Sequence, residues 1–229
     1  MHFYERAIDA MRVIYDRRIT TPSILDIAHY FPHAKRFTAN VADIREEALA
    51  VAGTLDRVPR FHDLMREQTE ISANDGRDWR MFILKAYGVP VEKNLARCPK
   101  LSALLAETPE AVSAVFSFLA PGKHIPCHRG PFRGILRFHL MLSMPHDTDG
   151  RPACELQIDG EPHLLAEGDS LLWDDTYPHE VWNRSEQVRI ALLLDVWRKD
   201  MPYDVEFLSR AIMLGTKAFL HMRGISYNA

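Results

Sequence analysis

The chain has 229 residues, of which 47% are hydrophobic, 26% charged and 10% aromatic. This length and composition suit one globular domain with a sizeable core, and they exclude an intrinsically disordered or collagen-like chain. Because 28 Lys and Arg face 31 Asp and Glu, the formal net charge is −3, too close to neutral for nucleic-acid binding by charge alone. The cysteines Cys98, Cys127 and Cys154 form no CxxC pair, which argues against a disulfide framework and a cysteine-only zinc site.

The start of the chain does not resemble a targeting segment. Glu5, Arg6 and Asp9 interrupt it, so we expect no signal peptide. No apolar run approaches the roughly 20 residues that a membrane span needs, so we expect no integral membrane segment. We therefore expect a cytoplasmic protein with a single domain over residues 1–229, and the oligomeric state is left open.

The first half of the chain, residues 1–108, is expected to be mainly helical. Asn40, followed three residues later by Asp43, is typical of a helix N-terminus. Apolar side chains then recur at helical spacing, at Ile44, Ala48, Val51 and Leu55. A second short helix is predicted over 59–66, with a proline at its start.

After Pro109 the hydrophobic period changes from 3.6 to two, which predicts strands. Residues 111–119 alternate, and residues 134–144 do so more cleanly. The even positions of 134–144 are all apolar and belong in a core, whereas the odd positions include Arg137 and His139. Such an odd face is what a polar pocket inside a β-barrel would present.

Three more strands and a final helix complete the predicted elements. The strands cover 153–158, 170–173 and 188–197, and their spacing favours a sandwich, jelly roll or barrel. After residue 202 the period returns to helical. The residues expected to pack this helix against the sheet are Phe207, Leu208, Ala211, Ile212, Phe219 and Leu220.

His139, His179 and Arg189 form the sharpest candidate site. His139 projects from the polar face of its strand, and His179 follows a turn-prone stretch at 174–178. Arg189 is the one inward cation of its predicted strand, so its burial requires an anion, either Asp195 or a bound carboxylate. Spacing alone does not distinguish a metal site from histidines that are hydrogen-bonded in a core.

Residues 111–146 contain no Asp or Glu and form a positive region suited to a small, multiply charged anion. We interpret Lys123 and Arg133 as members of a solvated basic loop. Arg137 shares the strand face of His139 and is the better site candidate.

Two further sets of reactive side chains are disfavoured as catalytic groups. Cys127 lies beside His128, but no third partner is fixed by spacing, so a thiol nucleophile is disfavoured. Asp174 and Asp175 are adjacent on a turn, where carboxylates serve hydrogen bonding more often than acid–base catalysis.

Seven short motifs occur in a characteristic order. They are Pro121-Gly122, His128-Arg129-Gly130-Pro131, Leu136-Arg137-Phe138-His139-Leu140, Gly168-Asp169, Trp173-Asp174-Asp175, His179-Glu180-Val181-Trp182-Asn183 and Arg189 with Asp195-Val196-Trp197. From about Ala111 to Arg198 this order resembles the aspartyl/asparaginyl β-hydroxylase family of Fe(II)/2-oxoglutarate-dependent dioxygenases. The sequence of the first two histidine motifs resembles that of the bacterial lipid A hydroxylase branch.

The resemblance implies a mainly β fold, a double-stranded β-helix (jelly roll, cupin-like). Its core would cover 109–198, with the helical segment 1–108 before it and a C-terminal helix within 199–229. It also implies that His139 and His179 bind the iron. Arg189 would pair with the distal carboxylate of the co-substrate 2-oxoglutarate, since a planar fork of donors suits a carboxylate.

Two positions depart from the pattern of these oxygenases. Most of them carry a ligand carboxylate two residues after the first histidine, where this chain has Met141. The β-hydroxylase family lacks that ligand and often has glycine there, and a thioether is a poor Fe(II) ligand, so we expect Met141 to pack beside the metal. Gln157 stands where relatives commonly have a basic residue, so His128 or Arg137 is expected to supply the second 2-oxoglutarate contact.

The function implied is hydroxylation of an unactivated C–H bond with O2, at the β-carbon of an Asp or Asn side chain in a peptide, protein or small molecule. A fatty-acyl chain on a lipid is the alternative, and the lack of an apolar span weighs against it. A protein of a different class, a non-enzymatic jelly-roll metal-binding module, is another alternative. Such a module would not need the inward cation Arg189. A degenerate oxygenase, in which Met141 and Gln157 mark lost activity, is a third possibility. No nucleic-acid partner is expected.

Overall fold

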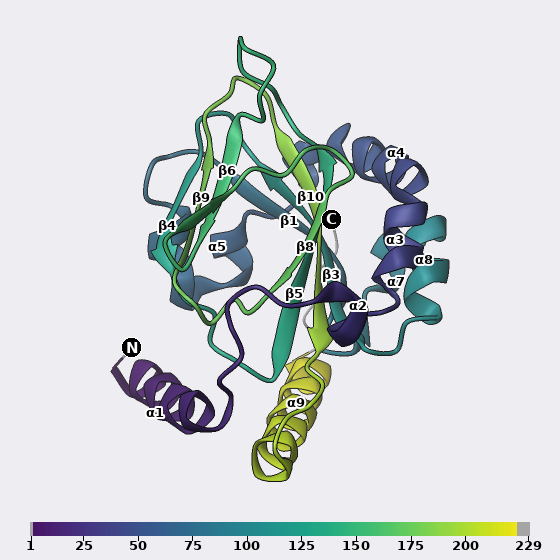
Figure 1. The fold of residues 1–229 in the computed structure, drawn as a ribbon. Coiled ribbons are helices and arrows are strands. Elements are labelled where there is room, and N and C mark those ends of the chain that lie inside the picture. Colours follow the sequence, from purple (N-terminus) through teal and green to yellow (C-terminus); the bar gives the residue numbers. More distant parts are fainter. Residues whose placement is uncertain (1, 224–229) are drawn as a thin grey trace.

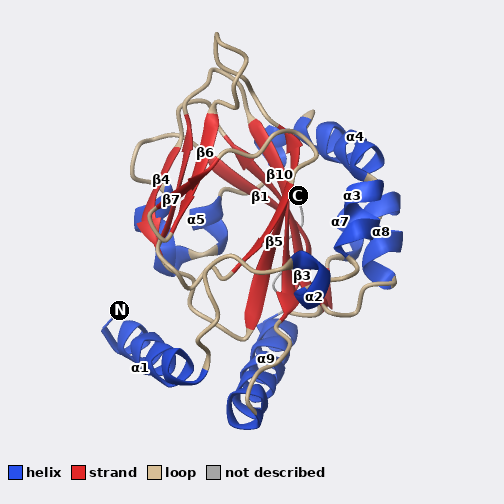
Figure 2. Ribbon diagram, in the orientation of Figure 1, coloured by secondary structure: helices blue, strands red, loops and turns tan. Residues whose placement is uncertain are grey.

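The computed structural model describes the backbone of residues 2–223 and the side chains of residues 10–220. Two antiparallel sheets face each other, with helices on one outer face and at one end (Figures 1 and 2). This arrangement confirms the predicted fold class, a mainly β jelly-roll core with helices at both ends of the chain.

The larger sheet has six strands and the smaller has four. The larger contains β1 (Trp79–Ala86), β2 (Val89–Pro90), β3 (Ala111–Leu119), β5 (Ile135–Ser143), β8 (Ser170–Trp173) and β10 (Arg189–Trp197). The smaller contains β4 (His124–His128), β6 (Cys154–Ile158), β7 (Glu161–His163) and β9 (His179–Asn183). The strand orders are β2-β1-β3-β10-β5-β8 and β4-β9-β6-β7.

Helices precede, interrupt and follow the strands. They are α1 (His2–Arg18), α2 (Ile27–Tyr30), α3 (Ala34–Ala39), α4 (Val41–Ala52), α5 (Phe61–Leu64), α6 (Thr69–Ser72), α7 (Glu92–Leu95), α8 (Pro99–Ala106) and α9 (Tyr203–Arg223). Short 3₁₀ turns cover Leu55–Arg57 and Arg66–Gln68.

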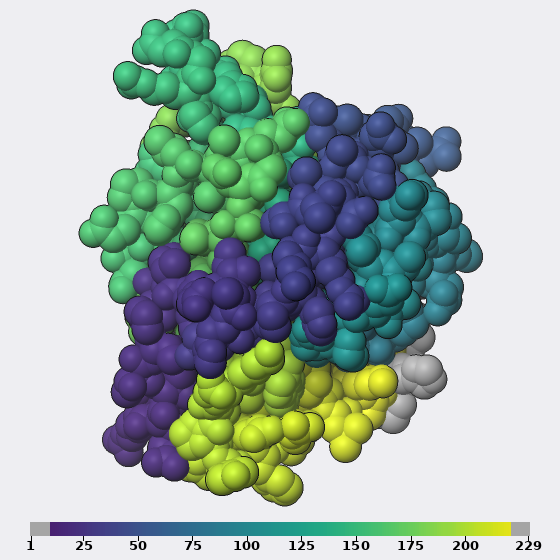
Figure 3. All heavy atoms as spheres, turned by 45° about the vertical axis from the view of Figure 1, so that its right-hand side comes forward, coloured from purple at the N-terminus to yellow at the C-terminus, as the bar shows by residue number. Residues whose placement is uncertain are grey.

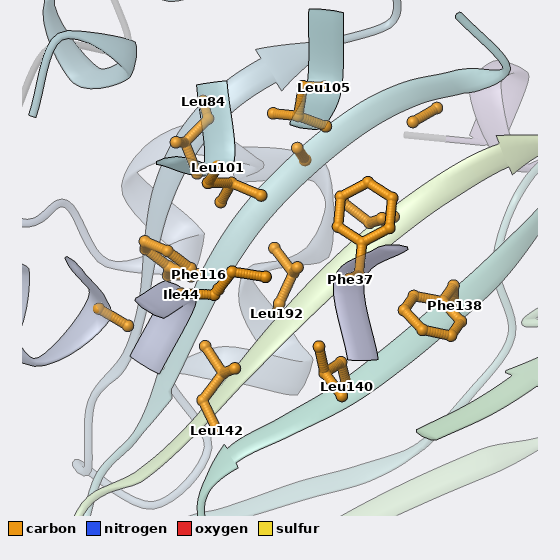
Figure 4. Packing of buried hydrophobic residues seen from close by; sticks show 14 of the residues in the cluster. Phe37, Ile44, Leu84, Leu101, Leu105, Phe116, Phe138, Leu140, Leu142 and Leu192 are labelled. Carbon is orange, nitrogen blue, oxygen red and sulfur yellow. The ribbon is translucent and has the colours of Figure 1, made fainter. Parts of the chain in front are cut away.

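The outer face of the larger sheet packs against α3, α4 and α8 to form the main core (Figure 4). Side chains alternate along a strand, so Phe138 and Leu140 of β5 point to this face together with Phe116 of β3 and Leu192 of β10. All four are fully buried. The prediction that the even positions of 134–144 lie in a core is therefore confirmed.

The inner faces of the two sheets enclose a second apolar cluster. Trp79 and Leu119 from the larger sheet meet Ile125, Leu156 and Val181 from the smaller one. The odd positions of β5 point into this space, as the alternation predicts, and they bring polar side chains between the sheets.

Several predicted boundaries need correction. The helix expected over 59–66 is a single turn, α5, followed by a 3₁₀ turn, and the Asp63 carboxylate accepts a hydrogen bond from the Arg60 backbone at its start. Residues 79–90 lie in the half expected to be helical, yet they form β1 and β2.

The final helix, α9, does not pack as predicted. Leu208 and Ile212 do contact an apolar cluster that contains Tyr15 and Val205. Phe207, however, points to solvent with 77% of its surface exposed, and Phe219 is also exposed. The reason is that α9 lies beyond the end of the sheet, beside α1, and only one of its faces is covered (Figure 1).

Candidate functional site

A cleft that is partly open to solvent lies between the two sheets. Its wall is largely apolar and includes Phe61, Leu64, Met65, Trp79, Met81, Ile83, Val115 and Leu193. Its polar groups include His128, Arg137, Asp175, His179 and Asp195. The cleft therefore joins a long apolar wall to a compact set of ionisable side chains.

His128 and His179 lie directly opposite each other on the neighbouring strands β4 and β9. Their ring centroids are 4.0 Å apart. The Nδ1 of His128 donates to the Pro126 carbonyl at 2.8 Å, and the Nδ1 of His179 donates to the Tyr177 carbonyl at 2.9 Å. Each ring thus carries its proton on Nδ1 and presents the lone pair of Nε2, which is how a histidine binds a metal.

Burial is the main reason that the pKa of both His128 and His179 lies below the usual value. The proximity of His128 lowers the pKa of His179 further, and Arg137 lowers that of His128. Both rings are therefore neutral near pH 7, the form that a metal ion requires.

His139 lies on β5 of the facing sheet and lines the inner space together with His179 and Arg189. Neither of its ring nitrogens has a hydrogen-bond partner among the described residues. Burial, followed by the charges of Arg189 and Arg137, lowers its pKa well below 6.5. His139 is thus a neutral ring that no described neighbour orients and that lies within the field of two cations.

Arg189 is 3% exposed, and its Nε and Nη1 have no hydrogen-bond partner in the described residues of the chain. Burial lowers its pKa, but a guanidinium still remains charged. Asp195, one of its two expected partners, is instead paired with Arg137, whose Nη2 lies 2.8 Å from Asp195 Oδ1. The alternative that Asp195 is its partner is therefore wrong, and the alternative of a bound carboxylate stays a prediction.

Asp175 lines the same cleft as the histidine pair. Burial raises its pKa to about 6, although Arg137 Nη2 lies 3.2 Å from its Oδ2. A Cβ on Gly130, two residues after His128, would overlap this carboxylate. Asp175 therefore occupies the space that a side chain at position 130 would need. The sequence analysis interpreted Asp175 as a hydrogen-bonding residue of a turn and did not predict that its carboxylate lines the cleft.

Lys123 and Arg133 are not members of a solvated loop, so that interpretation is wrong. Lys123 is fully buried, and its Nζ lies 2.7 Å from Asp75 Oδ1. Arg133 is also buried, and its Nε lies 2.9 Å from Asp174 Oδ2. Carboxylates from other segments therefore neutralise some of the charge of the acid-free stretch.

Gln157 lies on the outer face of β6, where its side chain reaches the Gly160 carbonyl at 3.4 Å. A basic residue there would not face the inner space either, so the change to Gln removes no contact inside it. Met141 is buried in an apolar cluster with Ala191 and Leu193, and the expectation that it packs beside a metal stays a prediction.

His163 is a residue that the sequence analysis did not single out. It pairs with Leu156, which points inward, so the His163 ring lies on the same side. Its buried Nε2 has no partner among the described residues, and it lines a small pocket that also contains His139 and Arg189. Its strand is only three residues long, so no alternation in the sequence reveals this orientation.

Known proteins are similar in sequence to most of this chain. A family model described as aspartyl/asparaginyl beta-hydroxylase matches residues 38–199. The ornithine lipid ester-linked acyl 2-hydroxylase of Rhizobium tropici is 34% identical over 196 residues, which cover 86% of this chain and 67% of that protein. Human aspartyl/asparaginyl beta-hydroxylase is 29% identical over 177 residues, which cover 75% of this chain and 22% of that protein.

Among solved structures, the Cupin_2 domain of an XRE family transcriptional regulator from Enterobacter cloacae aligns with 38% of this chain, and the alignment covers 82% of that domain's chain. The sequence identity is 21% and the TM-score is 0.31. The sequence matches carry the assignment: the chain belongs to the aspartyl/asparaginyl β-hydroxylase family, a family of hydroxylases.

Proposed function

We propose that this protein is an Fe(II)- and 2-oxoglutarate-dependent hydroxylase. The observation that supports this most strongly is the buried Arg189, which has two donors without a partner among the described residues, in the same inner space as neutral histidines. An uncompensated buried charge is costly, so such a site is selected for an anionic ligand. A dicarboxylate that reaches from a metal ion to Arg189 fits this requirement.

We propose His128 and His179 as the iron ligands, in place of the pair His139 and His179 implied by the resemblance. The first pair is opposed on neighbouring strands, and both of its Nδ1 atoms are held by backbone carbonyls. No described residue orients the ring of His139 in this way. This assignment also fits the absence of a ligand carboxylate in the family. Gly130 then lies two residues after the first histidine ligand, where the family often has glycine.

Arg189, His139 and His163 are proposed to hold the co-substrate. The Arg189 fork would receive the distal carboxylate, and His139 and His163, which line the same small pocket, would donate to it. Asp175, with a pKa of about 6, is able to hold or release a proton beside the histidine pair. When bound, iron and 2-oxoglutarate supply the oxidising power with which O2 hydroxylates an unactivated C–H bond.

The substrate class that the cleft supports best is a lipid acyl chain. Its wall is lined mainly by apolar side chains, which suits a hydrocarbon. The cations that line it are already engaged: Arg137 pairs with Asp195 and Asp175, and Lys85 Nζ donates to the Ala111 carbonyl at 2.7 Å. Arg137 is therefore not available to a substrate carboxylate, whereas Lys85 keeps its positive charge. The largely apolar wall is what reverses the order of preference given by the sequence analysis.

The β-carbon of an Asp or Asn side chain remains the second candidate, and the human relative is named for that activity. A direct comparison separates the two. The protein is incubated in air with Fe(II), 2-oxoglutarate and either acyl lipids, including ornithine lipids, or Asp- and Asn-containing peptides. We expect succinate and a +16 Da product with the lipids. Hydroxylation of the peptides alone would contradict the lipid assignment, and no succinate with any substrate would contradict the hydroxylase proposal.

A further inference from the structure

Exposed apolar side chains gather at the end of the molecule formed by α1 and α9. The two helices lie side by side there (Figures 1 and 3), and Arg18 Nε of α1 lies 2.8 Å from Asp204 Oδ2 of α9. Across the described side chains, eight large hydrophobic residues are exposed. Two are on α1 and four on α9: Val13, Ile14, Tyr203, Phe207, Leu214 and Phe219.

Three of these side chains form a stripe along the outer face of α9. Tyr203, Phe207 and Leu214 follow one another at spacings of four and seven residues, which places them on one side of a helix. Their exposed fractions are 91%, 77% and 70%. Val205 and Ser209 on the opposite side are buried. We call Tyr203, Phe207 and Leu214 the outer stripe of α9. A helix with apolar side chains on two faces normally has both faces covered.

The charge around the outer stripe favours an anionic surface. The described side chains of α1 and α9 carry more basic than acidic groups. Arg18 pairs with Asp204, and Arg210 with Glu206. Counting every charged side chain, the bases are Arg12, Arg17, Arg18, Arg210 and Lys217, and the acids are Asp16, Asp204 and Glu206. No helix in the described residues of the chain is long and apolar enough to cross a membrane. An amphipathic helix with aromatic residues on one side and basic residues beside them binds in the plane of a lipid surface instead.

The C-terminal part of α9, just beyond the outer stripe, lies near residues that line the cleft. The Lys217 side chain of α9 reaches the β1–β2 turn, where a Cβ on Gly88 would lie 3.9 Å from Lys217 Cδ. The residues just before that glycine, Lys85, Ala86 and Tyr87, line the cleft. A surface bound by α9 would therefore be close to this part of the cleft lining.

We propose that the α1–α9 end docks on an anionic lipid bilayer, with the outer stripe of α9 inserted among the headgroups and the cleft mouth turned toward the lipid. The choice of a lipid surface rests on the proposed function, because the substrate would then be supplied from that surface. Docking would let an acyl chain move from the bilayer into the cleft without crossing water.

The test is co-sedimentation of the full chain with vesicles of equal parts phosphatidylcholine and phosphatidylglycerol, without iron or 2-oxoglutarate. The test variant is Phe207→Ser with Leu214→Ser. The matched control is Leu49→Ser, which removes an exposed leucine from α4, far from the stripe in sequence. Burial of each large apolar side chain changes an equilibrium by about tenfold. We expect at least a tenfold loss of vesicle binding in the double variant and little change in the control.

Either of two kinds of result would overturn the proposal, one from vesicle binding and one from the oligomeric state. One is equal vesicle binding by the wild-type chain and the double variant, or no binding by either. The other is a wild-type dimer in analytical ultracentrifugation that the double variant abolishes, which would assign the stripe to a second copy. Thermal unfolding of both variants checks that the fold is intact. If the wild-type chain binds vesicles but hydroxylates no lipid, the lipid assignment in the proposed function fails and the docking surface stands.

Discussion

Replacing Arg189 with Met should stabilise the protein while removing its affinity for 2-oxoglutarate. Two buried donors of Arg189, Nε and Nη1, have no partner among the described residues. Each such group costs about 1–3 kcal/mol, and replacement of a buried charge by an apolar side chain of similar size gains about 1–4 kcal/mol. We take about 2 kcal/mol as the net gain, which in a chain of this size raises Tm by roughly 4–8 °C.

The assay is thermal unfolding of the metal-loaded protein with and without 2-oxoglutarate, using a catalytically inert divalent ion in place of iron. For the wild-type chain, a ligand at about 100 times its Kd adds about 2.7 kcal/mol of stability. The Arg189→Met variant should start from a higher Tm and gain nothing from the ligand. Arg189→Lys is the control, because it keeps the charge but loses the fork. A variant that is less stable without ligand, and that still responds to 2-oxoglutarate, would refute the argument.

Three further predictions concern the same site. His128→Ala should abolish iron binding in a metal titration, whereas His139→Ala should retain most of it and weaken 2-oxoglutarate binding instead; the reverse would restore the pair implied by the resemblance. His163→Phe should lower 2-oxoglutarate affinity by about tenfold to a hundredfold, because one hydrogen bond to a charged group contributes about 1.5–3 kcal/mol, and it should leave iron affinity unchanged in calorimetry. Asp175 has a folded-state pKa of about 6, above its ordinary 3.8, so its contribution to stability falls as pH rises between these values. Asp175→Asn should remove that fall, so its unfolding free energy relative to wild type should increase from about pH 4 to pH 7; a constant difference would contradict the raised pKa.

The strands that carry the site were predictable because their two faces differ. In β5 the even positions are apolar and the odd positions include Arg137 and His139, so alternation alone indicates which side faces a pocket. β1 was missed because its residues 81–84 are all apolar, and an apolar run in the sequence does not show a period of two. The conformation of β1 depends on packing against residues distant in the sequence, and no pattern within residues 79–86 indicates that packing.

The candidate site was predictable only to a limited extent. Arg189 was singled out because a cation on an otherwise apolar strand needs an anion, and its burial agrees with that reasoning. The pairing of His128 with His179 depends on β4 lying beside β9, which follows from the strand order and not from the spacing of the two histidines. Lys123 was misinterpreted for the same reason, since its partner Asp75 lies 48 residues earlier in the chain.

The most direct test of the central claim is an anaerobic titration of the metal-free protein with Fe(II) and 2-oxoglutarate, followed by visible absorption. A site in which His128 and His179 hold iron and Arg189 holds the far carboxylate predicts a charge-transfer band that appears only when both are present. The band should persist in His139→Ala at higher 2-oxoglutarate concentration and be lost in His128→Ala. Absence of the band in the wild-type chain, or its full retention in His128→Ala, would contradict the account.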